Sequence, residues 1–229
     1  MTEESGLAAP KEKVSVWDGV TRIWHWLTAI LIVAMWFTAD GPTMNIHITL
    51  GIVLVGLLVF RISWGIWGSS TARFSNFVKG PGAIISYLKK LKDPNYKASI
   101  GHNPLGALSV LALMALIAAQ LGTGLFATDT DGMNSGPLAR FIDYDTSRAL
   151  IDVHELIFRG IQAMVVLHLV AIAFYLVVKK TNLARAMVTG KLPAEQTDAT
   201  KAELKKPGPV ALVISLVIGA GVSALLFNL

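Results

Sequence analysis

Two histidines, His154 and His168, lie within one long apolar stretch, DVHELIFRGIQAMVVLHLVAIAFYLVVKK, over residues 152–180. An α-helix rises 1.5 Å per residue with 3.6 residues per turn, so their spacing corresponds to about 21 Å and about four turns. We therefore expect both imidazoles on one side of a helix, each near one face of a bilayer about 30 Å thick. Because a histidine at membrane depth is costly and indicates a function, this spacing suggests two haem irons stacked across a membrane.

Two further histidines complete this pattern. His25 lies early in an apolar run over 20–38, and His47 begins another over 46–67. In the topology derived below, His25 shares the depth of His168, and His47 shares the depth of His154. Each pair could supply both axial ligands of one haem. Such ligation leaves no open position on the iron and suits electron transfer rather than oxygen chemistry.

Other readings of these histidines remain open. Each one taken alone is also compatible with a hydrogen-bonded residue at a helix contact. A site for a small ion such as zinc fits less well, because ligands about 21 Å apart on one helix cannot share an ion. No carboxylate cluster accompanies the histidines within the apolar runs.

The elements that must position these residues are apolar helices. The chain has 229 residues, of which 53% are hydrophobic and 15% charged, values typical of membrane proteins. We predict an all-α integral membrane protein, with a four-helix transmembrane bundle holding two haems and a fifth C-terminal transmembrane helix. A short amphipathic helix is expected over 82–91. The predicted spans cover roughly 20–38, 46–67, 104–127, 152–180 and 209–229.

Three parts of the chain follow from this pattern. They are a polar cytoplasmic tail (1–17), a dihaem transmembrane core (18–191), and a linker with the additional helix (192–229). The tail does not resemble a signal peptide. No cysteine is present, which excludes disulfides, thiolate-bound iron–sulfur clusters and thioether-attached haem.

The loop charges predict the orientation. Lys and Arg number three in 1–22, seven in 61–103 and seven in 179–206, but none in 39–46 and two in 128–151. The positive-inside rule therefore places the N-terminus in the cytoplasm and the C-terminus in the periplasm, for a multi-pass protein of a bacterial inner membrane. These basic loops also account for the net charge of +5 without a nucleic-acid partner.

Several residues are candidates for contacts around the haems. Arg22 and Arg61 lie near the inner interface and could pair with haem propionates, although interfacial arginines also serve as membrane anchors. His102 could contact a propionate or a quinone, or simply stabilise its own turn. Gly51, Gly122 and Gly124 could make room for a macrocycle, although small residues equally allow close helix packing.

The chain resembles the bacterial cytochrome b561 proteins and the related b-type cytochrome subunits of nickel–iron hydrogenases. The resemblance covers roughly residues 15–191. It is carried, in order, by VWDGVTRIWHWL, HITLG, FRISWGIWG, ARFSNFVKGP, GHNPLGALSV, VHE with a histidine fourteen residues on, and NLARAMVTGK. It implies two b haems in a four-helix core, with His25, His47, His154 and His168 as ligands, and electron exchange with membrane quinone. The GHNP motif adds weight to His102.

We therefore expect transmembrane electron transfer between the quinone pool and a periplasmic redox partner, either a c-type cytochrome or a hydrogenase-like subunit. The alternative is a stand-alone quinone-linked oxidoreductase that acts on a small oxidant or reductant such as superoxide. A third reading is a membrane anchor whose haems only stabilise the fold. The sequence leaves a homo-oligomer open.

Overall fold

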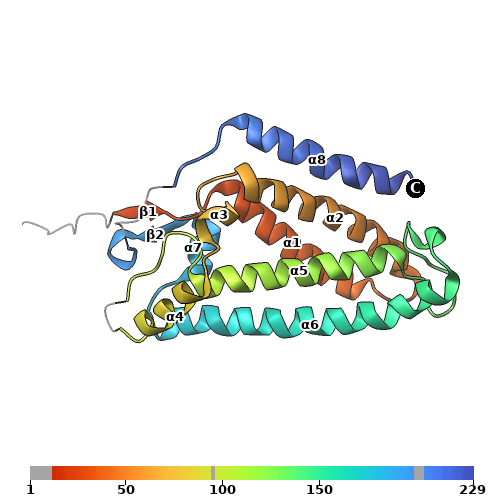
Figure 1. The fold of residues 1–229 in the computed structure, drawn as a ribbon, viewed down its shortest axis with the longest axis horizontal. Helices are drawn as coiled ribbons and strands as arrows, with labels where there is room; N and C mark the ends of the chain where they lie inside the picture. The colour runs from red at the N-terminus through yellow and green to blue at the C-terminus, as the bar shows by residue number, and fades with distance from the viewer. Residues whose placement is uncertain (1–11, 94–95, 199–203) are drawn as a thin grey trace, which may run out of the picture.

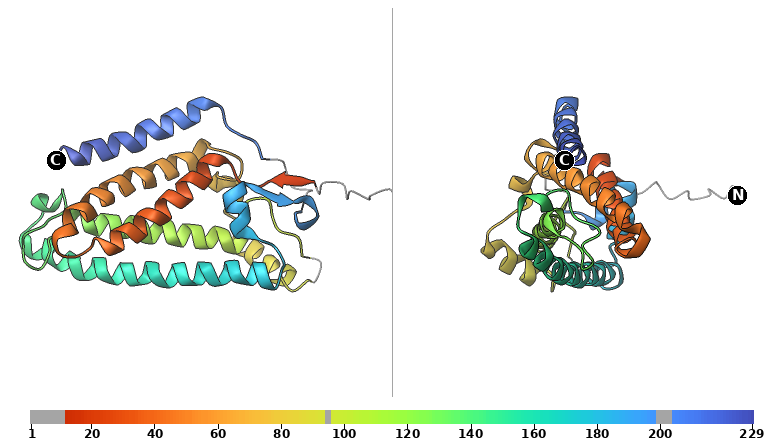
Figure 2. Two further views of the ribbon diagram at one scale, coloured as in Figure 1. Left: turned by 180° about the vertical axis from the view of Figure 1, so that it is seen from behind. Right: turned by 90° about the vertical axis from the view of Figure 1, so that its right-hand side faces the viewer.

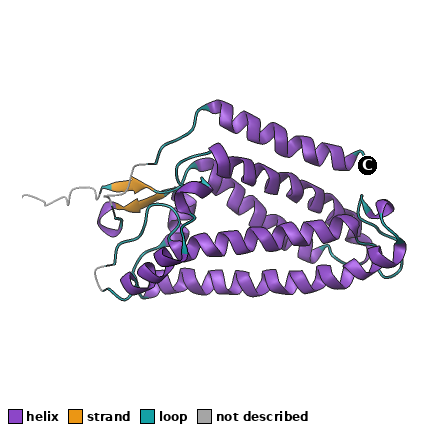
Figure 3. Ribbon diagram, in the orientation of Figure 1, coloured by secondary structure: helices purple, strands orange, loops and turns teal. Residues whose placement is uncertain are grey.

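The computed structural model describes residues 12–93, 96–198 and 204–229, and most of them are helical (Figure 3). Of the described helices, five are long and apolar enough to cross a membrane. These five are α1 (Gly19–Phe37), α2 (Met44–Trp67), α5 (Pro104–Phe126), α6 (Tyr144–Val177) and α8 (Pro209–Phe227). The shorter elements are β1 (Lys13–Ser15), η1 (Gly41–Thr43), α3 (Phe74–Phe77), α4 (Pro81–Lys90), η2 (Ala139–Phe141), α7 (Leu183–Thr189), β2 (Lys191–Pro193) and η3 (Ala194–Gln196).

Side-chain caps fix where three of the spans begin. Asp18 accepts a hydrogen bond from the Thr21 amide, and Asn103 accepts one from the Gly106 amide, both at 2.8 Å. Asp143 caps α6 in the same way. Because the first amides of a helix have no partner within it, such caps select the first residue of the helix. The caps of α1 and α6 therefore help to determine how far along the bundle His25, His154 and His168 lie.

The five spans agree with the apolar runs, but α6 begins eight residues before the predicted stretch. Its first residues, YDTSRALI, are too polar to be recognised by hydropathy, yet they form the first two turns of the helix, which Asp143 caps. At 34 residues, α6 is about 51 Å long, which exceeds the thickness of the hydrocarbon core. Hydropathy marks the part of a helix that lies in lipid, not the end of the helix.

The spans run side by side along the long axis of the molecule (Figures 1 and 2). Helix α2 packs against α1, α5 and α8, and α6 packs against α5. The four-helix bundle therefore consists of α1, α2, α5 and α6, and α8 lies outside it along α2. We call the end at which α1 and α5 begin the basic end, and the opposite end the acidic end.

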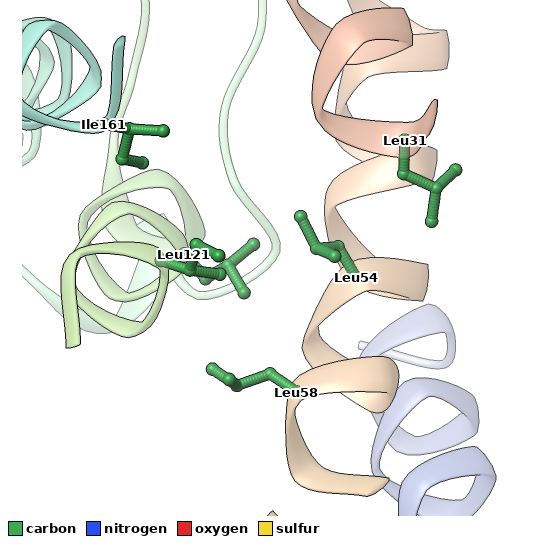
Figure 4. Close-up of a cluster of buried hydrophobic side chains, with 6 residues drawn as sticks. Leu31, Leu54, Leu58, Leu121 and Ile161 are labelled. Carbon is green, nitrogen blue, oxygen red and sulfur yellow. The ribbon is translucent and has the colours of Figure 1, made fainter. Parts of the chain in front are cut away.

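A layer of apolar side chains fills the middle of the bundle (Figure 4). Ile161 lies in it, seven residues from both His154 and His168. The layer therefore separates the two levels at which the histidines lie. Its buried members come from α1, α2, α5 and α6: Leu31, Leu54, Leu58, Ile117, Leu121 and Ile161.

Helix α8 is fitted closely to α2 through small residues. A Cβ atom at Gly219 would lie 2.6 Å from the Gly56 carbonyl oxygen, so the two backbones touch. The Ser223 hydroxyl donates to the Ile52 carbonyl at 2.9 Å, and Trp67 Nε1 donates to Ser215 at 3.1 Å. Between apolar helices in lipid, close van der Waals contact and such hydrogen bonds drive association.

A small folded cap closes the basic end. Strand β1 pairs antiparallel with β2, and Ala98 hydrogen-bonds Gln196 and Asp198 through the backbone. Side chains from the N-terminal segment, the 96–100 segment, α7 and β2 form its core: Val16, Ala98, Ala186 and Leu192, with Trp17, Tyr96, Ile100 and Leu183. The last residues of the predicted tail are thus joined to the segment that follows the core. The amphipathic helix expected over 82–91 is α4.

The contact between α8 and α2 can be tested by adding one carbon atom. Gly219→Ala should lower the free energy of unfolding by about 1–3 kcal/mol, because overpacking forces rigid backbone apart. Gly221→Ala, on the same helix with open space at its Cβ position, is the matched control and should not be destabilised. Denaturant unfolding in detergent micelles would measure both, and equal stabilities would contradict the packing described.

Candidate haem-binding sites

The four histidines of the spans meet as two pairs. The ring centres of His25 in α1 and His168 in α6 are 6.4 Å apart. Those of His47 in α2 and His154 in α6 are 6.2 Å apart. All four side chains are half-buried. The first pair lies in the basic half of the bundle and the second in the acidic half, so α6 contributes one member to each.

These separations suit a six-coordinate metal centre. With each imidazole nitrogen about 2 Å from a central iron, two axial rings have centres about 6 Å apart. Two imidazoles in direct contact, or bridged by one hydrogen bond, would not need a central gap of this size. The described residues contain no group of three or more His, Cys, Asp or Glu that could hold a metal ion on their own. The donor sets therefore fit haem, in which the macrocycle supplies the remaining ligands.

The pair in the acidic half has its ring orientation fixed by hydrogen bonds. His47 Nδ1 lies 2.9 Å from the Met35 carbonyl oxygen, and must therefore carry the proton. His154 Nδ1 lies 3.0 Å from the Thr123 hydroxyl, which donates its own hydrogen to α5 carbonyls and so accepts from the ring. In both rings Nε2 is left as the nitrogen with a free lone pair, the form that binds a metal.

A cavity of about 270 Å³ opens beside His47 and His154. Its wall includes residues of α1, α2, α5 and α6 together with the 134–137 loop. Most of the lining is apolar, with Trp36 and Phe158 among the larger side chains. This is the environment expected for a flat hydrophobic cofactor held between helices.

Glycines shape this cavity, and two of the three expected ones, Gly51 and Gly124, line it. Gly51 lines it, beside Met35. Gly122 does not line it, and an added Cβ atom there would meet no other atom within 4 Å. Gly124 lines it, and its Cβ atom would lie 2.8 Å from His154 Cε1. Two residues along a helix is more than half a turn, so Gly122 and Gly124 face different directions.

Buried polar atoms without a partner gather around the two pairs. Among the described residues, such atoms in the basic half include His25 Nδ1, Thr28 Oγ1 and Arg61 Nη1, and Gln120 Oε1 belongs to the cavity of the acidic half. Because an unsatisfied buried polar group costs about 1–3 kcal/mol, a cluster of them points to a bound group that these atoms face. A haem propionate is an acceptor of the kind that Arg61 Nη1 lacks.

Among the described residues, Arg61 is the largest of the fully buried side chains, with 2% of its surface exposed. Its guanidinium lies over Phe74, 4.9 Å from the ring centre, and donates from Nη2 to the Ala72 carbonyl. The carboxylate of Asp18 attracts it electrostatically. This fixed fork, with Nη1 unused, is suited to a carboxylate.

Asp18 is a polar residue of this site that was not predicted from the sequence. Its carboxylate is buried and accepts from the Thr21 hydroxyl at 2.6 Å and from the Ser69 hydroxyl at 2.5 Å. An aspartate three residues before Thr21, at the start of an apolar run, is a helix-start signal that the sequence does carry. Its burial, and its place near Arg61, depend on the segment after α2.

Arg22, the other candidate for a propionate contact, is turned toward the cap. Its Nη1 donates to the Val188 carbonyl, whereas its Nε is buried and has no partner. Gly190 lies against it in a left-handed conformation with φ of +80°. Arg22 therefore connects α1 to the end of α7, and its Nε–H group remains a buried donor without an acceptor.

His102 lies at the basic end between two aromatic rings. The centres of Trp17 and Phe77 are each 4.6 Å from its own, and its Nδ1 is buried without a partner. Burial, and then the positive charge of Arg61, lowers the pKa of His102 to about 3. The imidazole is therefore neutral near pH 7, beside the His25 and His168 pair, and available as a hydrogen-bond donor or acceptor.

Comparisons with known proteins identify similar sequences. A family model described as prokaryotic cytochrome b561 matches residues 16–190, which include both histidine pairs and end before α8. A protein described as "Probable Ni/Fe-hydrogenase B-type cytochrome subunit" from Azotobacter chroococcum mcd 1 is 29% identical over 156 residues, covering 55% of this chain. The aligned part spans 63% of that relative, less than two thirds of its length. No solved structure matches the chain.

Removing one histidine from each pair tests the ligand assignment. His25→Ala and His154→Ala should each lower haem content from two to about one per chain, because an axial ligand is lost from a different iron. Haem extraction and reduced-minus-oxidised spectra would measure this on the purified proteins. His102→Ala, which removes an imidazole outside the pairs, is the control and should keep both haems. A single haem in the unchanged protein would contradict the two-site assignment.

Gly124→Ala tests the fit at the acidic half. The added methyl group would displace the His154 ring and weaken haem binding about tenfold, the scale on which supporting residues tune metal sites. Gly122→Ala adds the same group to open space and should leave haem affinity unchanged. Haem titration of the apoprotein would compare them, and equal affinities would remove Gly124 from the site.

Proposed function

The chain belongs to the prokaryotic cytochrome b561 family, and from this membership we propose that it is a dihaem cytochrome b that carries electrons across a membrane. The observation that carries the proposal is the presence of two histidine pairs, with ring centres 6.4 and 6.2 Å apart, in opposite halves of one bundle. His25 and His168 would hold one haem, and His47 and His154 the other. Bound haem supplies a one-electron redox centre at each level.

The protein side chains then have separate tasks. The four imidazoles would hold the two irons, two to each, and ligation of this kind would suit electron transfer rather than oxygen chemistry. The apolar layer around Ile161 keeps water out of the space between the sites. Arg61 and Arg22 supply positive charge and unused donors at the basic end, where propionates would be stabilised. Hydrogen bonds donated by His47 to the Met35 carbonyl and by His154 to the Thr123 hydroxyl hold the rings of the other pair in a metal-binding form.

We place the quinone reaction at the basic end, beside His102 and Arg61. His102 is neutral, has an unused ring nitrogen, and lies near the first histidine pair. A ring nitrogen of this kind can donate to a quinone carbonyl or pass a proton to it. The basic loops at this end support a cytoplasmic location for it, because Lys and Arg are retained on that side of bacterial membranes.

The partner would then meet the acidic end, on the periplasmic side. The relative from Azotobacter chroococcum is described as a hydrogenase subunit, which supports a redox protein as the partner. The 128–145 segment carries Asp129, Asp131, Asp143 and Asp145, and Asp129 lines the cavity beside His47 and His154. A partner with a basic surface around its own redox centre would be steered to this end.

His102→Ala separates haem binding from quinone chemistry. The variant should keep both haems and full reduction by dithionite, yet its reduction by a short-chain quinol should slow about a hundredfold, the lower range for losing a proton-transferring group. Stopped-flow absorbance of the haems would measure both reactions on the same sample. Loss of a haem would overturn the ligand assignment, whereas an unchanged quinol reaction would place the quinone elsewhere. An unchanged protein that no quinol reduces would refute the quinone link.

A further inference from the structure

Three of the chain's four tyrosines meet at the basic end, although they come from distant parts of the sequence. Tyr87 belongs to α4, Tyr96 to the segment before α5, and Tyr175 to α6. The hydroxyl of Tyr87 is hydrogen-bonded to that of Tyr96 at 2.8 Å and, on its other side, to that of Tyr175. The three phenols therefore form one connected group of hydroxyls in which Tyr87 bonds both of the others, and the ring centres of Tyr96 and Tyr175 lie 6.2 Å apart.

The chain runs from the surface into the protein. Tyr96 is half-buried, whereas Tyr87 and Tyr175 are buried, with 6% and 7% of their surfaces exposed. Asn103 holds the inner end in place. Its side-chain oxygen accepts from the Gly106 amide, so its nitrogen is the atom that donates to the Tyr175 oxygen at 3.1 Å. The hydrogen of Tyr175 is thus free to point along the chain toward Tyr87.

The inner end lies close to the proposed quinone region. Tyr175 is seven residues after His168, which places it on the same face of α6, about 10 Å further toward the basic end. Asn103, which bonds Tyr175, directly follows His102. The hydroxyl chain therefore connects the surface of the basic end to the neighbourhood of His102 and the first histidine pair.

Quinone chemistry at this end requires such a connection. Reduction of a quinone to a quinol takes up two electrons and two protons, and oxidation of a quinol releases the same number. The electrons travel between the haems, but the protons must be exchanged with water. The folded cap built around Val16, Ala98 and Leu192 covers this end of the bundle. A route through side chains that can each accept and donate a proton is therefore needed.

We propose that Tyr96, Tyr87 and Tyr175 form the proton path between the aqueous phase at the basic end and the quinone site. The proposal rests on the proposed quinone function. For each proton delivered, the oxygen of Tyr96 accepts from water and passes its own proton to Tyr87, which passes one to Tyr175, and Tyr175 passes one toward the quinone. Four O–H bonds break, one in the aqueous donor and one on each tyrosine, and four form, one on each tyrosine and one on the quinone, so that the chain returns to its starting composition after the hydroxyls reorient. Quinol oxidation uses the same steps in reverse.

Burial of the chain favours neutral phenols. Burial, and then the hydrogen bond to Tyr175, raises the pKa of Tyr87, and burial raises that of Tyr96. Lys179 Nζ lies over the Tyr96 ring, 5.3 Å from its centre, and donates to the Asp93 carbonyl at 3.2 Å. Neutral hydroxyls can relay a proton without ever being held as phenolates, so the path stays complete across the physiological pH range.

The test interrupts the chain at its centre. Tyr87→Phe removes one oxygen and keeps the ring. Quinol-linked turnover should fall about tenfold through kcat, with KM unchanged, because proton transfer and not binding is impaired. Proton release in a single turnover, followed with a pH-indicating dye, should slow in the same proportion. A small weak acid such as acetic acid, supplied in the buffer, should restore part of the rate.

Two further variants separate this role from a structural one. Tyr96→Phe, at the outer end, should give the same partial defect and the same rescue. Tyr144→Phe, which alters the exposed tyrosine at the acidic end, is the matched control and should change neither turnover nor proton release. Reduced-minus-oxidised spectra and dithionite reduction should be unchanged in all three.

The outcomes discriminate between the proposals. Full turnover and unaltered proton release in Tyr87→Phe would overturn the proton path and leave the quinone function intact. A slow variant with a lowered unfolding temperature and no rescue would show that the tyrosines only hold α4 against α6, which also overturns it. Failure of the unchanged protein to react with any quinol would instead refute the quinone function itself, and the path with it.

Discussion

One straight helix, α6, contributes a histidine to each of the two pairs, and the rest of the bundle is built around that constraint. The rise between His154 and His168 is fixed by hydrogen bonds along the helix and cannot adjust independently at either site. Helices α1 and α2 must therefore present His25 and His47 at matching heights. The hydrogen bonds of Asp18 and Asp143 determine where α1 and α6 begin. They thereby help to fix the positions of His25 and of the two α6 histidines along the bundle.

Helix α2 links the two functional levels to the rest of the molecule. Toward the bundle it carries His47, the apolar layer and Arg61, and toward α8 it presents Gly56. The two faces satisfy different requirements, because the inner face must leave room beside the histidines whereas the outer face must allow close backbone contact. The family match ends before α8, so this outer contact is an addition to the shared core.

The basic end contains several buried polar and ionisable side chains, whose burial is unfavourable. Buried Arg61, buried Asp18 and a neutral His102 lie there, together with a chain of three phenols. In lipid such polar groups need partners from within the protein. The loops and the cap provide some of these partners, and the donors left unused face the region in which we propose the propionates and the quinone. With the quinone at this end, as proposed, protons would travel through side chains.

The sequence by itself determined the five spans, the short helix α4 and the depth matching of the four histidines. These predictions depend on hydropathy and periodicity, which can be read from short stretches of the sequence without knowing how the helices pack. Only the tertiary structure decided that the matched histidines lie about 6 Å apart, that Gly124 and not Gly122 faces His154, and that Tyr87, Tyr96 and Tyr175 form one hydrogen-bonded chain. It also showed that β1 pairs with β2 and that α8 packs on α2. These features depend on the rotation of each helix about its axis and on contacts between distant segments, which arise from the packing of complete helices and not from the sequence of any one of them.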